Sequence, residues 1–337
     1  MSEQTAAEIA ASDAHRGEAR PRRSVAVLGG TGLIGSAVAH AFLDDGRAVT
    51  VLARRAPDQR HAPLLEGASV VLGDASDPAS LRKALDGVDH VVAALGTPHP
   101  ADSARAPLAQ FEAEIPVLLG VLDEVRARSG VGLTYLSSGG AIYGDVDTLP
   151  VSEETECHPV SPYGVTKLAA ERYVLMASRT DGVDVRILRV ANAYGALQRP
   201  RTGQGIVAAL LHAAATGAPV RVFGDGSAVR DYVEVRDVAG AVVALEALDE
   251  VPQVINVGAG TGHRLTDVLE IVEAVTGRSI TVHHDAPRPS DVRAVVLDVT
   301  RLSSLVPWRP MPLEHGVADA WGAWVRWGLD GADGGAP

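Results

Sequence analysis

The sequence predicts an α/β protein built on a doubly wound parallel sheet, with a smaller C-terminal α/β lobe that binds the substrate. Three observations favour this fold: short apolar runs alternate with helical stretches, a glycine-rich loop follows the first run, and small or polar residues end several others. A strand that is buried on both faces of a sheet is almost continuously apolar, and parallel strands need helical crossovers between them. Ligands bind such sheets beyond the carboxyl ends of the strands, so the site is expected there.

The elements follow one another in the order that this fold requires. In the first part of the chain the apolar runs predict strands at residues 24–28, 48–52, 70–74, 88–96, 133–136 and 185–190. Helices are predicted at 36–45 and 104–128, and another begins at Pro162. The later part alternates less regularly, with strands predicted at 220–223, 229–233 and 254–258 and helices at 204–217 and 265–276. Alternation of this length predicts the parallel sheet.

The chain is also expected to divide into two domains. We expect residues 24–190 and about 232–258 to form a dinucleotide-binding domain, and residues 191–231 and 259–330 to form a lobe for the substrate. Residues 1–23 mix charged residues with alanines and predict a disordered tail, and residues 331–337 predict a frayed end.

The composition excludes several classes of partner. The 337 residues carry a net charge of −12, which argues against nucleic acid or an anionic membrane. No apolar run reaches the ~18 residues of a membrane span, and no signal peptide precedes the first strand. The single cysteine, Cys157, excludes an intrachain disulfide, which is typical of a cytoplasmic protein. No metal site is predicted.

The loop Gly29-Gly30-Thr31-Gly32-Leu33-Ile34-Gly35 joins the first strand to the first helix. Glycines at this spacing permit a tight turn and a close approach of the backbone to a pyrophosphate at a helix N-terminus. The loop therefore predicts a dinucleotide cofactor. Ala94, Leu95 and Gly96, at the end of the fourth strand, are expected to pass under it.

Two arginines, Arg54 and Arg55, follow the second strand where an NAD site usually carries an acid for the ribose. Guanidinium groups bind phosphate well, so NADP is the expected cofactor and NAD is the alternative. The arginines could instead be solvated loop charges. Asp74 is placed to contact the adenine amino group, or else to cap the helix near Pro78.

The motif Tyr163-Gly164-Val165-Thr166-Lys167 predicts the reacting centre. The chain holds only two lysines, Lys83 and Lys167, and one of them stands four residues after a tyrosine. Residues four apart share one face of a helix. An ammonium group beside a phenol stabilises the phenolate, which makes the tyrosine a general acid–base. The alternative is an ordinary helix N-terminus with a lysine that lies on the surface and has no catalytic role.

With these motifs the chain resembles the extended short-chain dehydrogenase/reductase superfamily, and most closely its sugar-nucleotide epimerase/dehydratase branch, the branch of UDP-glucose 4-epimerase. The resemblance runs from about Ser24 to Gly328. Further motifs that carry it are Tyr143-Gly144, Arg189…Asn192, Gly224-Asp225-Gly226…Arg230-Asp231-Tyr232 and Asn256-Val257-Gly258. It implies a Rossmann-like sheet and an NAD(P)-dependent enzyme that acts on a nucleotide-linked sugar.

The resemblance also implies roles for single residues. Tyr163 is expected to exchange the proton of the sugar oxygen, and Lys167 to hold the nicotinamide ribose. Asn192 would lie near the sugar diphosphate. Arg230 and Arg288 would grip that diphosphate, and Asp291 would lie near the nucleoside ribose. The alternative for Arg230 is an ion pair with Asp231 or Asp237, and for Arg288 a solvated loop.

The chain departs from the family at two positions. Where the family carries its catalytic Ser or Thr, four residues before Tyr143, this chain has Gly139. Ser138 is the nearest hydroxyl and the expected catalytic one, with Ser137 or a backbone N–H as alternatives. Glu114 stands near the place of a family asparagine and is open to interpretation as a surface acid.

The first functional interpretation is an NADP-dependent ketoreductase of a nucleotide-linked keto-deoxysugar, because Arg54 and Arg55 favour NADP. The alternative is an NDP-hexose 4-epimerase with tightly bound NAD. A dehydratase is less favoured, because Gly139-Gly140 replace the Asp-Glu pair expected after the catalytic hydroxyl. A non-enzymatic cofactor sensor would have no need of Tyr163 and Lys167. Relatives imply a homodimer through the helix of Tyr163 and the helix before it.

Overall fold

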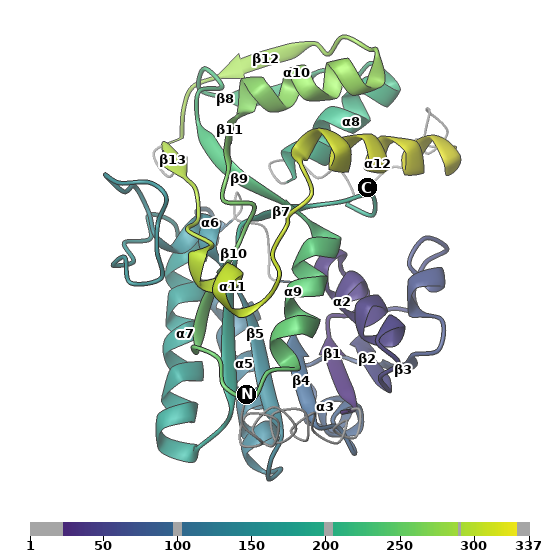
Figure 1. Cartoon of the computed structure of the whole chain (residues 1–337), viewed down its shortest axis with the longest axis vertical. Coiled ribbons are helices and arrows are strands. Elements are labelled where there is room, and N and C mark those ends of the chain that lie inside the picture. The colour runs from purple at the N-terminus through teal and green to yellow at the C-terminus, as the bar shows by residue number, and fades with distance from the viewer. Residues whose placement is uncertain (1–22, 97–102, 199–204, 289–290, 329–337) are drawn as a thin grey trace, which may run out of the picture.

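A computed structural model describes residues 23–96, 103–198, 205–288 and 291–328. Its centre is a seven-stranded sheet in the order β10-β6-β5-β4-β1-β2-β3 (Figure 1). All of its strand pairs are parallel. The strands are β1 (Val25–Leu28), β2 (Val49–Ala53), β3 (Ser69–Leu72), β4 (His90–Ala93), β5 (Gly132–Ser138), β6 (Val185–Val190) and β10 (Val254–Val257). The predicted doubly wound, Rossmann-like sheet is confirmed, with its order reversing between β1 and β4.

Helices cover both faces of the sheet. One face carries α2 (Leu33–Asp44) and α9 (Val235–Glu246), and the other carries α3 (Pro78–Ala84), α5 (Pro107–Arg126) and α7 (Pro162–Asp181). Alternate residues of β1 belong to different cores: Val25 and Val27 pack on the first face, Ala26 and Leu28 on the second. This alternation explains why the strand is apolar at every position.

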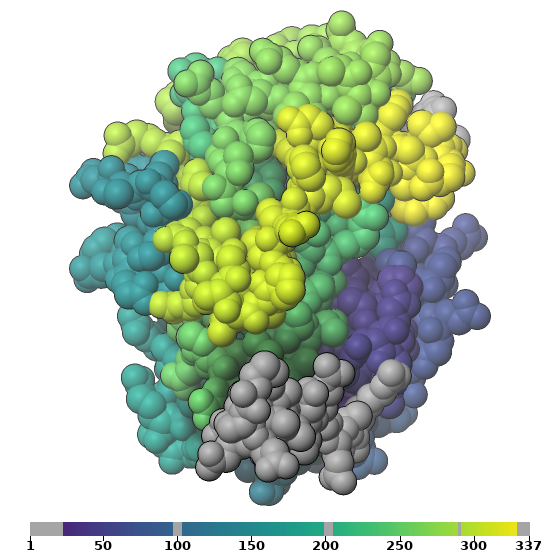
Figure 2. All heavy atoms as spheres, in the orientation of Figure 1, coloured from purple at the N-terminus to yellow at the C-terminus, as the bar shows by residue number. Residues whose placement is uncertain are grey.

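A smaller lobe stands beyond the carboxyl ends of the strands (Figure 1). Its elements are β7 (Asn192–Tyr194), α8 (Ile206–Thr216), β8 (Val220–Phe223), β9 (Val229–Glu234), β11 (Gly262–Arg264), α10 (Leu265–Thr276), β12 (Val282–Asp285), β13 (Ala294–Val295) and α12 (Leu313–Arg326). It has its own apolar core. Short elements complete the chain: η1 (Ala62–Leu65), α6 (Gly139–Ile142) and α11 (Thr300–Leu305). Figure 2 shows C-terminal residues, in yellow, lying over the face between lobe and sheet.

The predicted helix boundaries are most accurate where a glycine ends the helix. Helices α9 and α12 were not predicted, whereas α10 begins and ends where predicted. Gly277 closes α10 in the left-handed conformation, whereas α9 is rich in valine and ends at Ala247 without a glycine. The predicted tails lie outside the described residues, apart from Arg23, whose guanidinium is 3.6 Å from Glu246. Among the helices of the described ranges, none combines the length and apolarity needed to cross a membrane.

Candidate active site

The glycine loop forms a narrow backbone turn between β1 and α2. Gly29 has φ +80°, and a Cβ there would lie 2.5 Å from the carbonyl oxygen of Ala94. A Cβ on Gly35 would overlap the carbonyl of Gly29. Helix α2 begins after Gly32, and no side chain caps its first turn. A close backbone approach and uncapped N–H groups fit a dinucleotide pyrophosphate.

The neighbouring cofactor predictions lie around this turn. Thr31, Leu33 and Ile34 are half-buried within it, and Ala94, Leu95 and Gly96 follow β4 directly beside Gly29. These positions agree with a cofactor that crosses the carboxyl ends of β1 and β4, at the point where the strand order reverses. Their contacts with a cofactor stay predictions.

Arg54 and Arg55 are exposed at the end of β2. Asp74 is exposed after β3, and hydrogen bonds from Ser76 and the charge of Arg54 lower the pKa of its carboxyl. Asp74 does not cap the next helix, because Asp77 accepts hydrogen bonds from the backbone N–H groups of Ala79 and Ser80. Asp74 is therefore available for its predicted contact with adenine, and it lies near enough to Arg54 to feel its charge.

Helix α7 positions the reacting tyrosine. The Ser161 hydroxyl accepts a hydrogen bond from the Gly164 N–H at 3.1 Å and caps the helix, and Pro162 occupies its first position. A Cβ on Gly164 would overlap the carbonyl of Ala141, so the helix start packs directly on α6. This contact holds Tyr163 near the turn that follows β5.

Lys167 lies one turn after Tyr163 and is only 5% exposed. Its Nζ is 5.8 Å from the ring centroid of Tyr163 and 2.6 Å from Oε1 of Glu114. The incidental surface lysine is therefore ruled out, and Glu114 is not a surface acid, since it is also 5% exposed. Tyr135 donates a hydrogen bond to Glu114 at 2.5 Å and accepts one from Lys167 at 3.3 Å. The sequence analysis missed Tyr135, whose only signal is a phenol in an apolar strand.

The two candidate serines differ in their surroundings. Ser137 is buried and donates to Oε1 of Glu171 at 2.6 Å, so its hydroxyl is already engaged. Ser138 is half-buried at the N-cap of α6 and makes no side-chain capping bond there. A side chain at Gly139 would meet Leu297 at 2.7 Å and the Arg189 carbonyl at 3.0 Å, which explains why no hydroxyl stands there. Ser138 thus keeps a hydroxyl for a ligand.

A buried network lies behind Ser137. Arg189 donates to both carboxylate oxygens of Glu171 (2.8 Å to Oε2 from Nη2, 3.2 Å to Oε1 from Nε) and to the Tyr143 hydroxyl at 2.9 Å. Tyr143 in turn donates to Asn256 at 2.8 Å. This network ties α7 to β5, β6 and β10 and fixes the strand ends that present the site. Glu171 was missed by sequence analysis.

The predicted substrate residues approach from the lobe. Asn192 starts β7, and its Oδ1 lies 3.0 Å from where a Cβ on Gly140 would stand. Arg230 is half-buried and forms neither of the ion pairs considered for it: Asp231 accepts from the N–H groups of Ala259, Gly260 and Leu297, and Asp237 from that of Met311. Burial lowers the pKa of the Arg230 guanidinium. In the part of the chain that the structure describes, Arg230 forms no ion pair with a carboxylate, although the charges of Asp291 and Asp145 act on it. A half-buried cation of this kind fits a role in binding an anion.

Arg288 lies over the ring of Phe223, with its Cζ 3.4 Å from the ring centroid. This contact holds the side chain, so Arg288 is not simply a solvated loop residue. Oδ2 of Asp291 accepts a hydrogen bond from the Arg288 N–H at 3.3 Å. Both residues lie beyond the lobe strand β12.

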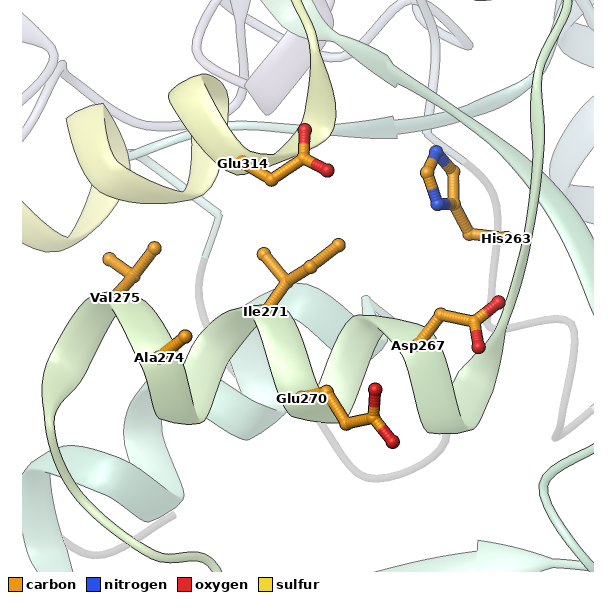
Figure 3. A pocket seen from close by; sticks show the side chains of 7 residues that line it. All are labelled: His263, Asp267, Glu270, Ile271, Ala274, Val275 and Glu314. Atoms are coloured by element: carbon orange, nitrogen blue, oxygen red, sulfur yellow. The ribbon is translucent and has the colours of Figure 1, made fainter.

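A hollow between α10 and α12 is separate from these residues. It is lined by His263, Asp267, Glu270, Ile271 and Glu314, among others (Figure 3). No predicted site residue contributes to it. Within the described ranges, no group of histidine, cysteine and acidic side chains is arranged to hold a metal ion.

The chain belongs to the NAD dependent epimerase/dehydratase family, which its residues 25–258 match. It is an enzyme of the extended short-chain dehydrogenase/reductase type, NAD(P)-dependent and acting in sugar-nucleotide chemistry.

Particular relatives are epimerases. The chain is 31% identical over 304 residues to the UDP-glucose 4-epimerase of Mycolicibacterium smegmatis, covering 87% of this chain and 95% of that one. Among solved structures, UDP-glucose 4-epimerase of Thermotoga maritima with UDP-glucose has a TM-score of 0.84 at 29% identity, over 90% of this chain and 99% of that one. The Thermus thermophilus enzyme with NAD has a TM-score of 0.83 at 31% identity, over 92% and 99%.

Proposed function

We propose that this enzyme is a nucleotide-sugar 4-epimerase acting on a UDP-linked sugar. The observation that carries the proposal is the buried Lys167, whose Nζ lies 5.8 Å from the ring centroid of Tyr163. The start of their helix packs on α6, whose N-cap residue Ser138 makes no capping bond with its hydroxyl. The relatives named above support the epimerase over the ketoreductase, which was the first interpretation of the sequence. The lobe supplies Arg230 and Arg288 for the diphosphate.

In this mechanism Tyr163 takes the proton from the sugar 4-hydroxyl and later returns it from the same phenol. Ser138 donates a hydrogen bond to the same sugar oxygen and orients it. Lys167 keeps a positive charge near Tyr163 and favours its phenolate form. The glycine loop of residues 29–35 and Lys167 would hold a dinucleotide, which would supply reversible hydride transfer when bound. Arg230 and Arg288 hold the diphosphate and Asp291 the nucleoside ribose, which keeps the sugar at the reacting groups.

The experiment follows the cofactor and the product together. The purified enzyme is desalted, its cofactor absorbance is recorded, and UDP-, dTDP- and GDP-linked sugars are added without further cofactor. Products are identified by nuclear magnetic resonance, because 4-epimers have equal mass. An epimerase retains its dinucleotide and converts a UDP-sugar. Loss of all cofactor on desalting, with no conversion of any sugar, contradicts the proposal.

The ketoreductase remains the second candidate because of Arg54 and Arg55. Both guanidinium groups are exposed at the end of β2, where a ribose phosphate would lie, and this favours NADP over the NAD bound by the Thermus relative. Replacing both arginines by alanine should weaken NADP binding by about tenfold or more and leave NAD binding nearly unchanged. Equal weakening of both cofactors, measured by calorimetry, removes the phosphate role.

The remaining proposals concern assembly and location. Leu108 and Phe111 of α5 and Val165 and Met176 of α7 are large apolar residues that stay exposed. Their helices are the ones through which a homodimer was expected, and this apolar surface supports the proposal. Among the other apolar residues of α7, Ala169, Val174 and Leu175 pack on the core of the second face and Leu168 on that of the first. A cytoplasmic location stays a prediction from the single cysteine.

A further inference from the structure

Glu114 brings a second charge to the lysine on which Tyr163 depends. It lies within α5, and its Oε1 receives both the ion pair from Lys167 at 2.6 Å and the hydrogen bond from Tyr135 at 2.5 Å. Its Oε2 accepts a weaker bond from the fully buried Gln110 at 3.3 Å. The carboxylate is therefore held from two sides and cannot turn away from the lysine.

The charge states of this cluster follow from its partners. Burial lowers the pKa of the Lys167 ammonium, but Tyr135, Glu114 and Tyr163 outweigh it and raise that pKa well above its ordinary value. Burial also raises the pKa of Tyr135 well above its ordinary value, so this phenol stays protonated and donates.

We infer that Glu114 is a positioning residue that sets the proton affinity of Tyr163 through Lys167. The inference rests on the proposed function for its catalytic meaning. A lone ammonium would stabilise the phenolate of Tyr163 strongly. A carboxylate 2.6 Å from that ammonium offsets much of its charge, so Tyr163 holds its proton more firmly. The carboxylate also anchors Nζ, which fixes the distance between lysine and phenol.

The sign of the effect does not depend on which group loses the proton. Removing the negative charge of Glu114 makes it easier to remove a proton from the pair Tyr163 and Lys167, whether the proton leaves the phenol or the ammonium. The titratable groups that face Lys167 are Glu114 from α5, Tyr135 from β5 and Tyr163 from its own helix. The next acid on α7, Glu171, is already paired with Arg189.

Tyr135 contacts both charges, since its hydroxyl donates to Glu114 and accepts from Lys167. Tyr135→Phe removes one stabilising contact from the carboxylate and one from the ammonium, and these two losses change the proton affinity of the pair in opposite directions. That substitution should therefore change the proton affinity of the pair less than Glu114→Gln does. A role of Glu114 in packing alone predicts no change that follows its charge.

The test titrates the phenolate of Tyr163 by ultraviolet difference absorbance, with each variant measured against the same protein carrying Tyr163→Phe. Glu114→Gln should lower the midpoint by about one pH unit or more, and Tyr135→Phe should shift it by less. Glu112→Gln is the matched control, since it removes the same charge from an exposed position of α5. Its midpoint should stay within about 0.3 of the wild type, because exposed charges are screened.

An unchanged or raised midpoint in Glu114→Gln overturns the inference. If Glu114→Gln does not fold, Glu114→Asp decides, because it keeps the charge but moves it away from Nζ of Lys167: the midpoint should fall, and an unchanged or raised midpoint contradicts the inference. The phenolate signal is measured without turnover. Failure of this inference can therefore be distinguished from failure of the proposed function, which the sugar assay tests. Where a UDP-sugar is converted, the pH profile of kcat should shift with the midpoint, while KM stays nearly constant.

Discussion

Helix α7 carries one member of each of two buried ion pairs, one turn apart, and they are built differently. Arg189 makes several bonds of 3.3 Å or less, to both oxygens of Glu171, to Tyr143 and to the Glu153 carbonyl. Lys167 makes one short contact, to Glu114, and two long ones of 3.3 and 3.4 Å, to Tyr135 and the Leu136 carbonyl. Ideal N–H···O distances end near 3.2 Å, so two lysine donors are weakly engaged and open to a ligand.

The cations also differ in what they can do when a partner is lost. Arginine stays charged at any accessible pH, whereas a buried lysine can release its proton. The arginine of the Arg189–Glu171 pair therefore keeps its charge at any accessible pH. The charge of the lysine in the Lys167–Glu114 pair can change, and we call this the adjustable pair. The adjustable pair is the one that lies beside the reacting phenol.

The largest expected effect is a difference in unfolding free energy between variants of Glu171 and Glu114. Glu171→Gln leaves Arg189 buried with its charge uncompensated, which should cost about 3–5 kcal/mol in the free energy of unfolding. Glu114→Gln should cost less than half of that, because Lys167 can become neutral. Chemical denaturation of both variants measures the difference. Equal losses of unfolding free energy in the two variants would show that the buried lysine and the buried arginine respond alike when their acid is removed. That result would contradict the difference between the two pairs.

The next largest effect is expected on turnover, when the phenol beside the adjustable pair is removed. Tyr163→Phe should lower kcat at least ~100-fold, equivalent to about 2.7 kcal/mol, because the general acid–base is gone. Affinity for the cofactor and the free energy of unfolding should change little. Near-normal kcat in this variant would remove Tyr163 from the mechanism.

The smallest effects distinguish the two neighbouring serines. Ser138→Ala should lower kcat by about tenfold without changing stability, because its hydroxyl is free for the substrate. Ser137→Ala should cost about 1 kcal/mol of stability, since Glu171 loses a donor, and change kcat much less. The reverse assignment of effects would place Ser137 at the substrate.

The sequence was informative where chemistry depends on local spacing. The sheet, the glycine loop and the pair Tyr163 and Lys167 could be predicted, because each rests on a strand–loop–helix or a one-turn spacing. The partner of Lys167 could not, since it depends on how α5 packs against α7. The steric exclusion of a side chain at Gly139 could not be predicted either, because it comes from Leu297, which is far away in the sequence. Contacts between distant segments are not written in any local pattern.

The most direct test of the central claim compares product with cofactor consumption. UDP-galactose is added to the desalted enzyme with NADPH or NADH present, and UDP-glucose formation and cofactor absorbance are followed together, with Tyr163→Phe as the blank. The proposed epimerase converts the sugar with no net loss of NADPH or NADH. Product that forms only in proportion to cofactor consumed would contradict this account and identify a reductase.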